Sequence, residues 1–181
     1  MTIGRFALNI VLQGLQPLID GKEPVLGTHA KAIDPEARRR LAAACFNKTW
    51  TLLEKDDRTP EDDDEMLHCA HASRYHWGEI GTAANRARGE WQCARVYAVL
   101  GRPEPALHHA RRCLEICESD PGALEDWDLP FAYEALARAH ALGGEAAEAA
   151  RCLAQARALG AAIAEEDERA LLGADLATIR T

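Results

Sequence analysis

The sequence predicts an all-α fold. Of the 181 residues, 35 are alanine and only 6% are aromatic, a composition typical of closely packed helices. No stretch alternates apolar and polar residues for long enough to predict a β-strand. Because 48% of the residues are hydrophobic, the chain can bury the core of one soluble domain.

Residues 1–34 are predicted to form a separate segment, a short helix followed by a loop. Apolar side chains recur from Ile3 to Leu18, and glycine and proline residues interrupt the pattern. This apolar stretch is too short to span a membrane, and its polar residues do not suit a signal peptide. We therefore expect no association with a membrane.

The first long helix is predicted over residues 35–54. Asp34 is placed to cap its N-terminus, and Pro35 has the backbone conformation that a first helical residue needs. A broad apolar stripe that includes Phe46 and Trp50 then marks the face expected to be buried.

The second long helix is predicted over residues 60–77, with Thr59 as N-cap and with Gly78 and Gly81 as the residues that break it. Eight acidic and two basic residues lie between positions 54 and 65, a local charge of −6 in a chain whose net charge is −8. Negative side chains near a helix N-terminus are stabilised by the helix dipole. The acidity therefore has a structural explanation and needs no separate function.

Glycine, proline and N-cap signals place five further helices. Their expected ranges are 82–100, 103–118, 129–142, 145–159 and 165–179. Asp128 is expected to be the N-cap of the third of these. The sequence thus predicts seven main helices.

The cysteine pattern predicts free thiols in a reducing compartment. Six cysteines are spread through segments that read as helix, and no CxxC pair occurs. Cys113 and Cys117 are four residues apart on one helical face, a geometry that suits a disulfide poorly. We therefore expect buried thiols and a cytoplasmic protein.

Charge and motifs exclude several classes of function. The net charge of −8 repels nucleic acid and anionic membranes. The one basic triplet, at residues 38–40, has no aromatic residues interleaved and reads as an exposed helix side. Neither a P-loop nor a dinucleotide-binding glycine motif occurs. No family signature positions a cysteine against a histidine for nucleophilic catalysis.

A segment of the sequence recurs after 43 residues. Residues 93–101 and 136–144 carry small, basic, aromatic and glycine residues in the same order, and Ala106 then aligns with Ala149. A repeated unit of helix, glycine turn and helix is typical of an α-solenoid, whose units bury their apolar faces by stacking.

These residues resemble tetratricopeptide repeats. The shared features are a small residue, an aromatic residue or histidine three positions later, a glycine turn and a following alanine. In the two repeats they are Ala94 and Ala137, Tyr97 and His140, Gly101 and Gly144, and Ala106 and Ala149. The resemblance covers about residues 82–159. The repeat offset is 43 residues where the family usually has 34, and the family's proline after the second helix is missing.

The resemblance implies antiparallel helix pairs at about residues 35–78, 82–118 and 129–159, followed by a capping helix at 165–179. Residues 35–181 would then form one tetratricopeptide-like domain. The segment Met66–Trp77 also resembles uncharacterised bacterial proteins of this type. The resemblance therefore implies a fold and no particular chemistry.

It also implies a concave groove, lined by the first helix of each pair, that binds a peptide. The groove-facing positions fall at Arg88, Trp91, Arg95, Glu134 and Arg138. Because guanidinium groups match carboxylate geometry, Arg95 and Arg138 predict a protein or peptide partner with an acidic or C-terminal carboxylate segment. The main expectation is a non-catalytic interaction or scaffold module without a cofactor. In the alternative, these arginines are solvated or pair with Glu90 and Glu134 at helical spacing, and Trp91 belongs to the core.

A second hypothesis, of a different class, is a metal-binding protein or metalloenzyme. Glu65, His68 and His71 step by three residues along one predicted helix, so their side chains share a face and suit a divalent transition metal. His108 and His109 would have to approach across the fold to complete the coordination shell. In the alternative, these histidines hydrogen-bond at a helix seam or lie exposed.

A third hypothesis is a small-molecule sensor whose pocket is lined by Tyr75, Trp77 and Trp91. Its basis is the clustering of aromatic residues, which more commonly belong to a core. Short helical arrays can also leave apolar ends that pair with another copy, so we also consider a homodimer.

Overall fold

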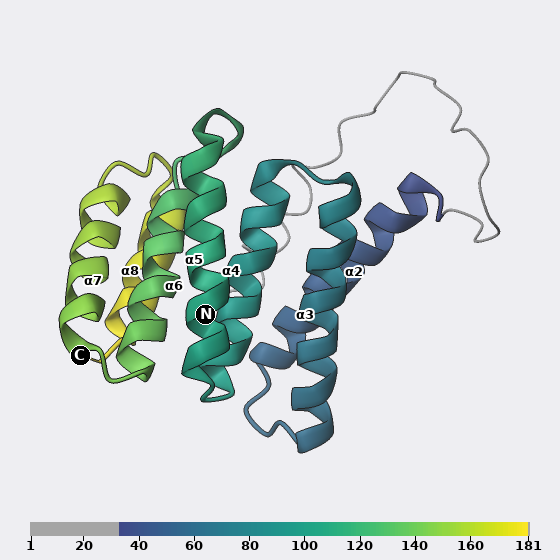
Figure 1. Cartoon of the computed structure of the whole chain (residues 1–181), viewed down its shortest axis with the longest axis horizontal. Helices are drawn as coiled ribbons and strands as arrows, with labels where there is room; N and C mark the ends of the chain where they lie inside the picture. The colour runs from purple at the N-terminus through teal and green to yellow at the C-terminus, as the bar shows by residue number, and fades with distance from the viewer. Residues whose placement is uncertain (1–32, 181) are drawn as a thin grey trace.

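The computed structural model describes residues 33–180, and this range is an all-helical array without strands (Figure 1). Its seven α-helices are α2 Pro35–Leu53, α3 Pro60–Ile80, α4 Ala83–Val99, α5 Pro103–Ser119, α6 Asp128–Leu142, α7 Ala146–Gly160 and α8 Glu166–Ala177. A short 3-10 helix, η1 Pro121–Ala123, lies between α5 and α6. The short helix predicted before residue 34 lies outside the described residues.

Side-chain caps explain why the first helices begin where the sequence predicts. The carboxylate of Asp34 accepts a backbone N–H of the first turn of α2 at 2.9 Å. Thr59 and Asp62 form a capping box at the start of α3, with bonds of 3.2 and 2.8 Å, and Thr82 and Asn85 repeat the arrangement at α4. Each cap satisfies N–H groups that have no partner inside the helix.

Two predicted helix boundaries are wrong. The helix α3 does not end at Gly78 but continues through it to Ile80. A glycine inside a helix costs only about 1 kcal/mol relative to alanine, which the packing of a 21-residue helix offsets. Asp128 is not an N-cap but the first residue of α6, after Trp127, and its buried carboxylate binds Arg88 instead.

The helices form two layers. The even-numbered helices contact one another in order, α2 with α4, α4 with α6, and α6 with α8. The odd-numbered helices α3, α5 and α7 pack against their chain neighbours on either side, so that consecutive helices lie side by side (Figure 1). As a result α4 has α3 on one side and α5 on the other, and side chains from all three helices meet at its surface.

The repeated unit of the sequence has a repeated backbone. Gly101 and Gly144 both have positive φ, 69° and 77°, a conformation that favours glycine. The backbone N–H of the next residue, Arg102 or Glu145, donates to a carbonyl five residues earlier at 2.9 Å in both turns.

Alanine and aromatic residues build the core between these layers. Seven alanines at helix contacts are fully buried, namely Ala42, Ala106, Ala110, Ala132, Ala137, Ala149 and Ala156. Trp50, Trp91 and Phe131 form a chain of ring contacts with centroids 5.4 and 5.3 Å apart. Small residues let the backbones approach, and the rings fill the wider spaces. Within the described range, no helix is long and apolar enough to cross a membrane.

Candidate metal centre

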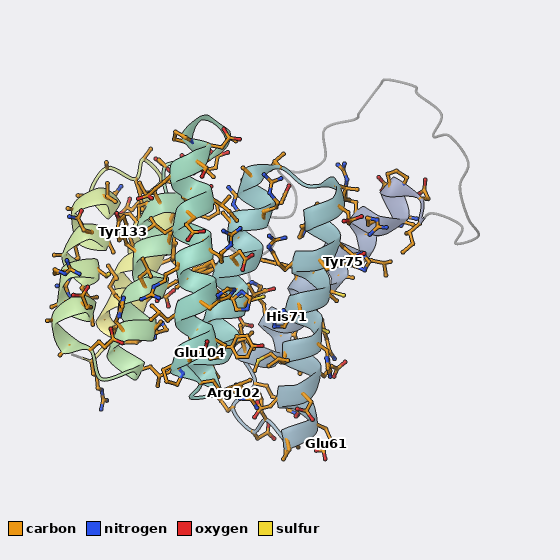
Figure 2. All side chains as sticks on the ribbon, in the orientation of Figure 1. Glu61, His71, Tyr75, Arg102, Glu104 and Tyr133 are labelled. Atoms are coloured by element: carbon orange, nitrogen blue, oxygen red, sulfur yellow. The ribbon has the colours of Figure 1, made fainter. Side chains whose placement is uncertain are left out.

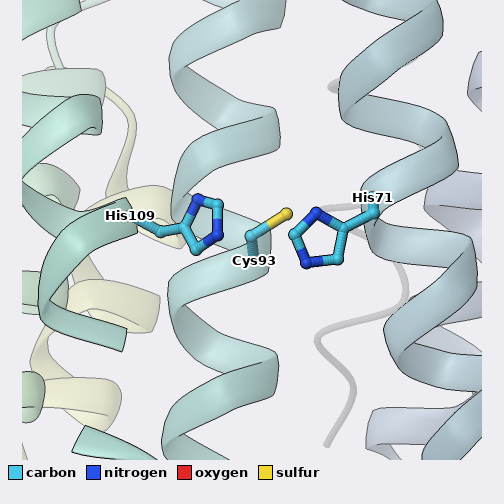
Figure 3. Close-up of side chains that lie close together, drawn as sticks. All are labelled: His71, Cys93 and His109. Carbon is cyan, nitrogen blue, oxygen red and sulfur yellow. The ribbon is translucent and has the colours of Figure 1, made fainter. Parts of the chain in front are cut away.

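Three potential metal ligands from three helices meet beside α4. They are His71 of α3, Cys93 of α4 and His109 of α5, and their donor atoms all lie within 4.8 Å of one another. Figure 3 shows the three side chains pointing toward one another, with the Cys93 sulfur between the two rings. Among the described residues, these are the three histidine, cysteine or carboxylate side chains whose donor atoms come this close together.

Hydrogen bonds fix the ring of His109. Its Nδ1 pairs with Oε2 of Glu90 at 2.6 Å, and Oε1 of the same carboxylate accepts from Nε of Arg74 at 2.8 Å. The ring also stacks on Tyr97, with centroids 5.5 Å apart and planes 8° from parallel. Since Nδ1 is engaged, Nε2 is the ring nitrogen that remains to bind a ligand.

His71 is oriented in the same manner. Its Nε2 is bonded to the hydroxyl of Tyr97 at 2.9 Å, which leaves Nδ1 for a ligand. The residue is half-buried on the side of α3 that faces α4 (Figure 2). Burial lowers the pKa of His71, and the neighbouring His109 lowers it further. Both effects favour the neutral imidazole that binds metals.

Cys93 is fully buried between the two histidines. Burial raises the pKa of its thiol, and the nearby carboxylate of Glu90 adds to this effect while Arg74 opposes it. The thiol is therefore neutral without a cation beside it, and a bound cation would favour the thiolate. Two imidazole nitrogens and one thiolate sulfur are ligands that zinc and other soft transition metals prefer.

Of the three metal ligands predicted from sequence, the structure brings only His71 into this set. Glu65 instead lies 3.5 Å from Nζ of Lys48, and His68 is exposed. Residues on one face of a single helix are neighbours, but the partners of His71 come from the helices packed against that face. The sequence considered His109 as a ligand that would approach across the fold, but it did not identify Cys93, because a single cysteine within a helix reads as a core thiol.

The residues predicted to line a peptide groove are paired with other residues of the chain: Arg88 forms a separate buried ion pair, and the other four share one polar network around Glu134. Arg88 binds Asp128 through two bonds of 2.8 Å and lies over the ring of Trp127. Arg95 binds Glu134 at 3.2 Å and Asp175 of α8 at 2.5 Å. The remaining members are Trp91, which donates to Glu134, and Arg138, which binds Glu134, the backbone carbonyl of Asp175 and the hydroxyl of Thr178.

Glu134 is the centre of this network and is fully buried. Burial disfavours its charge, but Arg95 and Arg138 outweigh burial and lower the pKa of Glu134. Helical pairing of Arg138 with Glu134 is thus present. Arg95 pairs across helices with Glu134 rather than with Glu90, which binds Arg74 and His109.

The three aromatic residues of the sensor hypothesis lie in different environments. Tyr75 is 61% exposed, whereas Trp77 and Trp91 are buried. Trp91 packs between Trp50 and Phe131 in the core, with Nε1 donating to Glu134.

Comparison with known proteins adds no relative. No protein-family model matches the sequence, and neither the curated proteins nor the solved structures contain a match to it. The functional assignment therefore depends on the geometry of the site.

Proposed function

We propose that this protein binds a divalent transition metal of the zinc class through Nδ1 of His71, Sγ of Cys93 and Nε2 of His109. The observation that supports the proposal most directly is the convergence of these donor atoms from three helices, within 4.8 Å of one another. Three protein ligands would leave one tetrahedral position for water or another ligand, as in zinc sites that are accessible to substrate.

The surroundings of the ligands support this proposal. Metal-binding histidines usually donate their second ring N–H to a carboxylate or another polar group, which fixes the ring and its tautomer. The carboxylate of Glu90 is the acceptor at Nδ1 of His109, and the hydroxyl of Tyr97 is the hydrogen-bond partner at Nε2 of His71. Arg74 in turn holds Glu90, so the second layer of contacts is itself oriented.

Metal titration of the purified, metal-free protein tests the proposal. We expect one equivalent of Zn²⁺ in native mass spectra, and with Co²⁺ a charge-transfer absorption from a sulfur–cobalt bond. His71→Ala, Cys93→Ser and His109→Ala should each weaken binding at least about tenfold. His68→Ala and His108→Ala change exposed histidines next to the site in sequence and should bind like the wild type.

Two results would contradict the assignment. One is the absence of stoichiometric metal at micromolar Zn²⁺ in a folded protein. The other is a loss of metal in His68→Ala or Glu65→Ala while His109→Ala still binds it. That result would favour Glu65, His68 and His71 on α3 as the ligands.

A second candidate is an interaction module of the tetratricopeptide-like type, supported by the repeated turns at Gly101 and Gly144. Its partner would be a helix that carries a carboxylate, because α8 presents Asp175 to Arg95 in this way. A labelled peptide of residues 165–180 should bind the Asp175→Ala/Leu176→Ala protein, whose own α8 is weakened, more tightly than the wild type. Equal or absent binding would remove this candidate.

We further propose that the protein is cytoplasmic. All six cysteines are free, which is the state expected in a reducing compartment.

A further inference from the structure

Cys45 of α2 and Cys69 of α3 form a pair of neighbouring thiols outside the metal centre. Both are half-buried, and their side chains interact with each other. They belong to two antiparallel helices that pack together along their length. A disulfide between them requires that the two sulfur atoms lie at the same height along the seam between the helices.

Contacts on either side of the pair establish the register of α2 against α3. Ser73 donates from its hydroxyl to the carbonyl of Ala42 at 2.9 Å. Six residues further along α2, Lys48 lies 3.5 Å from Glu65. Cys45 is midway between Ala42 and Lys48, and Cys69 is midway between Ser73 and Glu65. The two thiols are therefore at the same level of the seam.

The other cysteines differ in access or geometry. Cys93, Cys113 and Cys117 are at most 2% exposed. Cys113 and Cys117 also belong to one helix, where a spacing of four residues suits a disulfide poorly. Cys152 is half-buried on α7, at the far end of the array from α2 and α3 (Figure 1). Cys45 and Cys69 thus combine partial exposure with a partner on another helix.

We propose that Cys45 and Cys69 are a redox-active pair that low-molecular-weight disulfides, such as oxidised glutathione, convert to an internal disulfide. One thiolate attacks the glutathione disulfide, forms a mixed disulfide and releases one glutathione thiol. The second cysteine attacks the mixed disulfide, forms the Cys45–Cys69 bond and releases the second glutathione thiol. The protein loses two hydrogens, and one oxidised glutathione is reduced.

The bond would connect the first two helices covalently and close a ring that contains the acidic turn between them. A cross-link across such a ring restricts the unfolded chain and stabilises the folded one. Oxidation would therefore make the α2–α3 pair more resistant to unfolding, and reduction by a thiol would reverse the change. This inference does not depend on the proposed metal site, because neither cysteine is one of its ligands.

Peptide mapping of the full-length, metal-free protein tests the inference. Trypsin places Cys45 in residues 41–48 and Cys69 in residues 59–74, with no other cysteine in either peptide. After oxidised glutathione and alkylation of the remaining thiols, we expect the two peptides joined by a disulfide. Intact protein should lose two of its six thiols and gain a higher melting temperature, both reversed by dithiothreitol.

Single variants supply the controls. Cys45→Ser should give a stable glutathione adduct on Cys69 and no internal disulfide, whereas Cys152→Ser should behave like the wild type. Glutathione that remains on Cys45 or Cys69 of the wild type without cross-linking would overturn the inference. So would a disulfide that forms preferentially between other cysteines.

Discussion

Two groups of polar residues lie on opposite sides of α4 and differ in how they are paired. On the side facing α3 and α5, the histidines of the candidate metal centre each use one ring nitrogen in a hydrogen bond and keep the other for a ligand. On the side facing α6 and α8, the arginines Arg95 and Arg138 are paired with carboxylates and carbonyls of the same chain. A polar cluster that keeps ring nitrogens for a metal or another ligand is a candidate binding site. A cluster whose charged groups pair with one another contributes instead to the stability of the fold.

The largest effect is expected in the charge network around Glu134. Glu134→Ala leaves Arg95 and Arg138 without their shared buried carboxylate, so we expect a loss of about 3–5 kcal/mol in the free energy of unfolding. Urea denaturation measures this loss. Glu115→Ala removes an exposed pair with Arg112 and should cost less than about 1 kcal/mol. Similar losses in both variants would show that the network is not a special stabilising unit.

The pH dependence of the stability lost in Glu134→Ala tests whether the charge of Glu134 causes the loss. Because the pKa of Glu134 lies below its ordinary value of 4.5 in the folded protein, its stabilising contribution is complete above that value. The contribution is lost as the pH falls through the folded pKa. The difference in stability between wild type and Glu134→Ala should therefore narrow on acidification below pH 4.5, and a constant difference would contradict this account.

The next largest effect is expected at the metal centre, on metal affinity. Glu90→Gln keeps the shape of the side chain but removes the carboxylate charge beside His109. We expect Zn²⁺ to bind about 10- to 100-fold more weakly, measured by competition with a chelator. Glu104→Gln, an exposed change on α5, is the matched control and should leave affinity unchanged. Equal affinities in the two variants would argue that Glu90 does not support the metal.

Substitution of Asp175 should lower the free energy of unfolding less than substitution of Glu134. Burial raises the pKa of Asp175 above its ordinary value of 3.8, and Arg95 offsets this only in part. The native state therefore takes up this proton more readily than the unfolded state, the opposite of Glu134. Asp175→Asn should change the free energy of unfolding by less than about 1 kcal/mol. A loss of unfolding free energy as large as that of Glu134→Ala would show that the packing of α8 against Arg95 requires the ionised carboxylate of Asp175.

The smallest effect on stability is expected in the acidic segment at residues 54–65, where α3 begins. The pKa of Asp62 is lowered from 3.8 to about 2, mainly by its bond to Lys55 and then by the backbone N–H of Thr59. Its contribution is present above pH 3.8 and is lost as the pH falls toward 2. Thermal unfolding should show Asp62→Asn slightly less stable than wild type at neutral pH and equal to it near pH 2. A difference that persists in acid would point to the shape of the cap rather than its charge.

Local chemistry made much of the fold predictable. The N-caps Asp34, Thr59 and Thr82 bond to the first turns that follow them, so their signals concern a few adjacent residues. The turn glycines likewise act through their own backbone. The sequence marked both Gly78 and Gly81 as breaks, and α3 continues past the first and is capped by the second. Local chemistry could not choose between them, because Gly78 permits a helix end without requiring one.

The candidate sites were less predictable. The sequence placed His71 among metal ligands, but its spacing favoured Glu65, which pairs with Lys48, and His68, which is exposed. For the groove it identified Arg95 and Arg138, yet gave no sign that α8 supplies a carboxylate to Arg95. In both cases the decisive contact joins residues far apart in the chain.

The sequence by itself determined the all-α class, the number and order of the long helices and the repeated turn, because these depend on helix propensity, capping and backbone conformation within a few residues. Tertiary structure alone decided which polar side chains of different helices meet. The partners of His71 lie 22 and 38 residues further along the chain, and α8 lies 80 residues from Arg95 at Asp175. Such contacts depend on which helix faces turn toward each other, and that follows from packing the whole array.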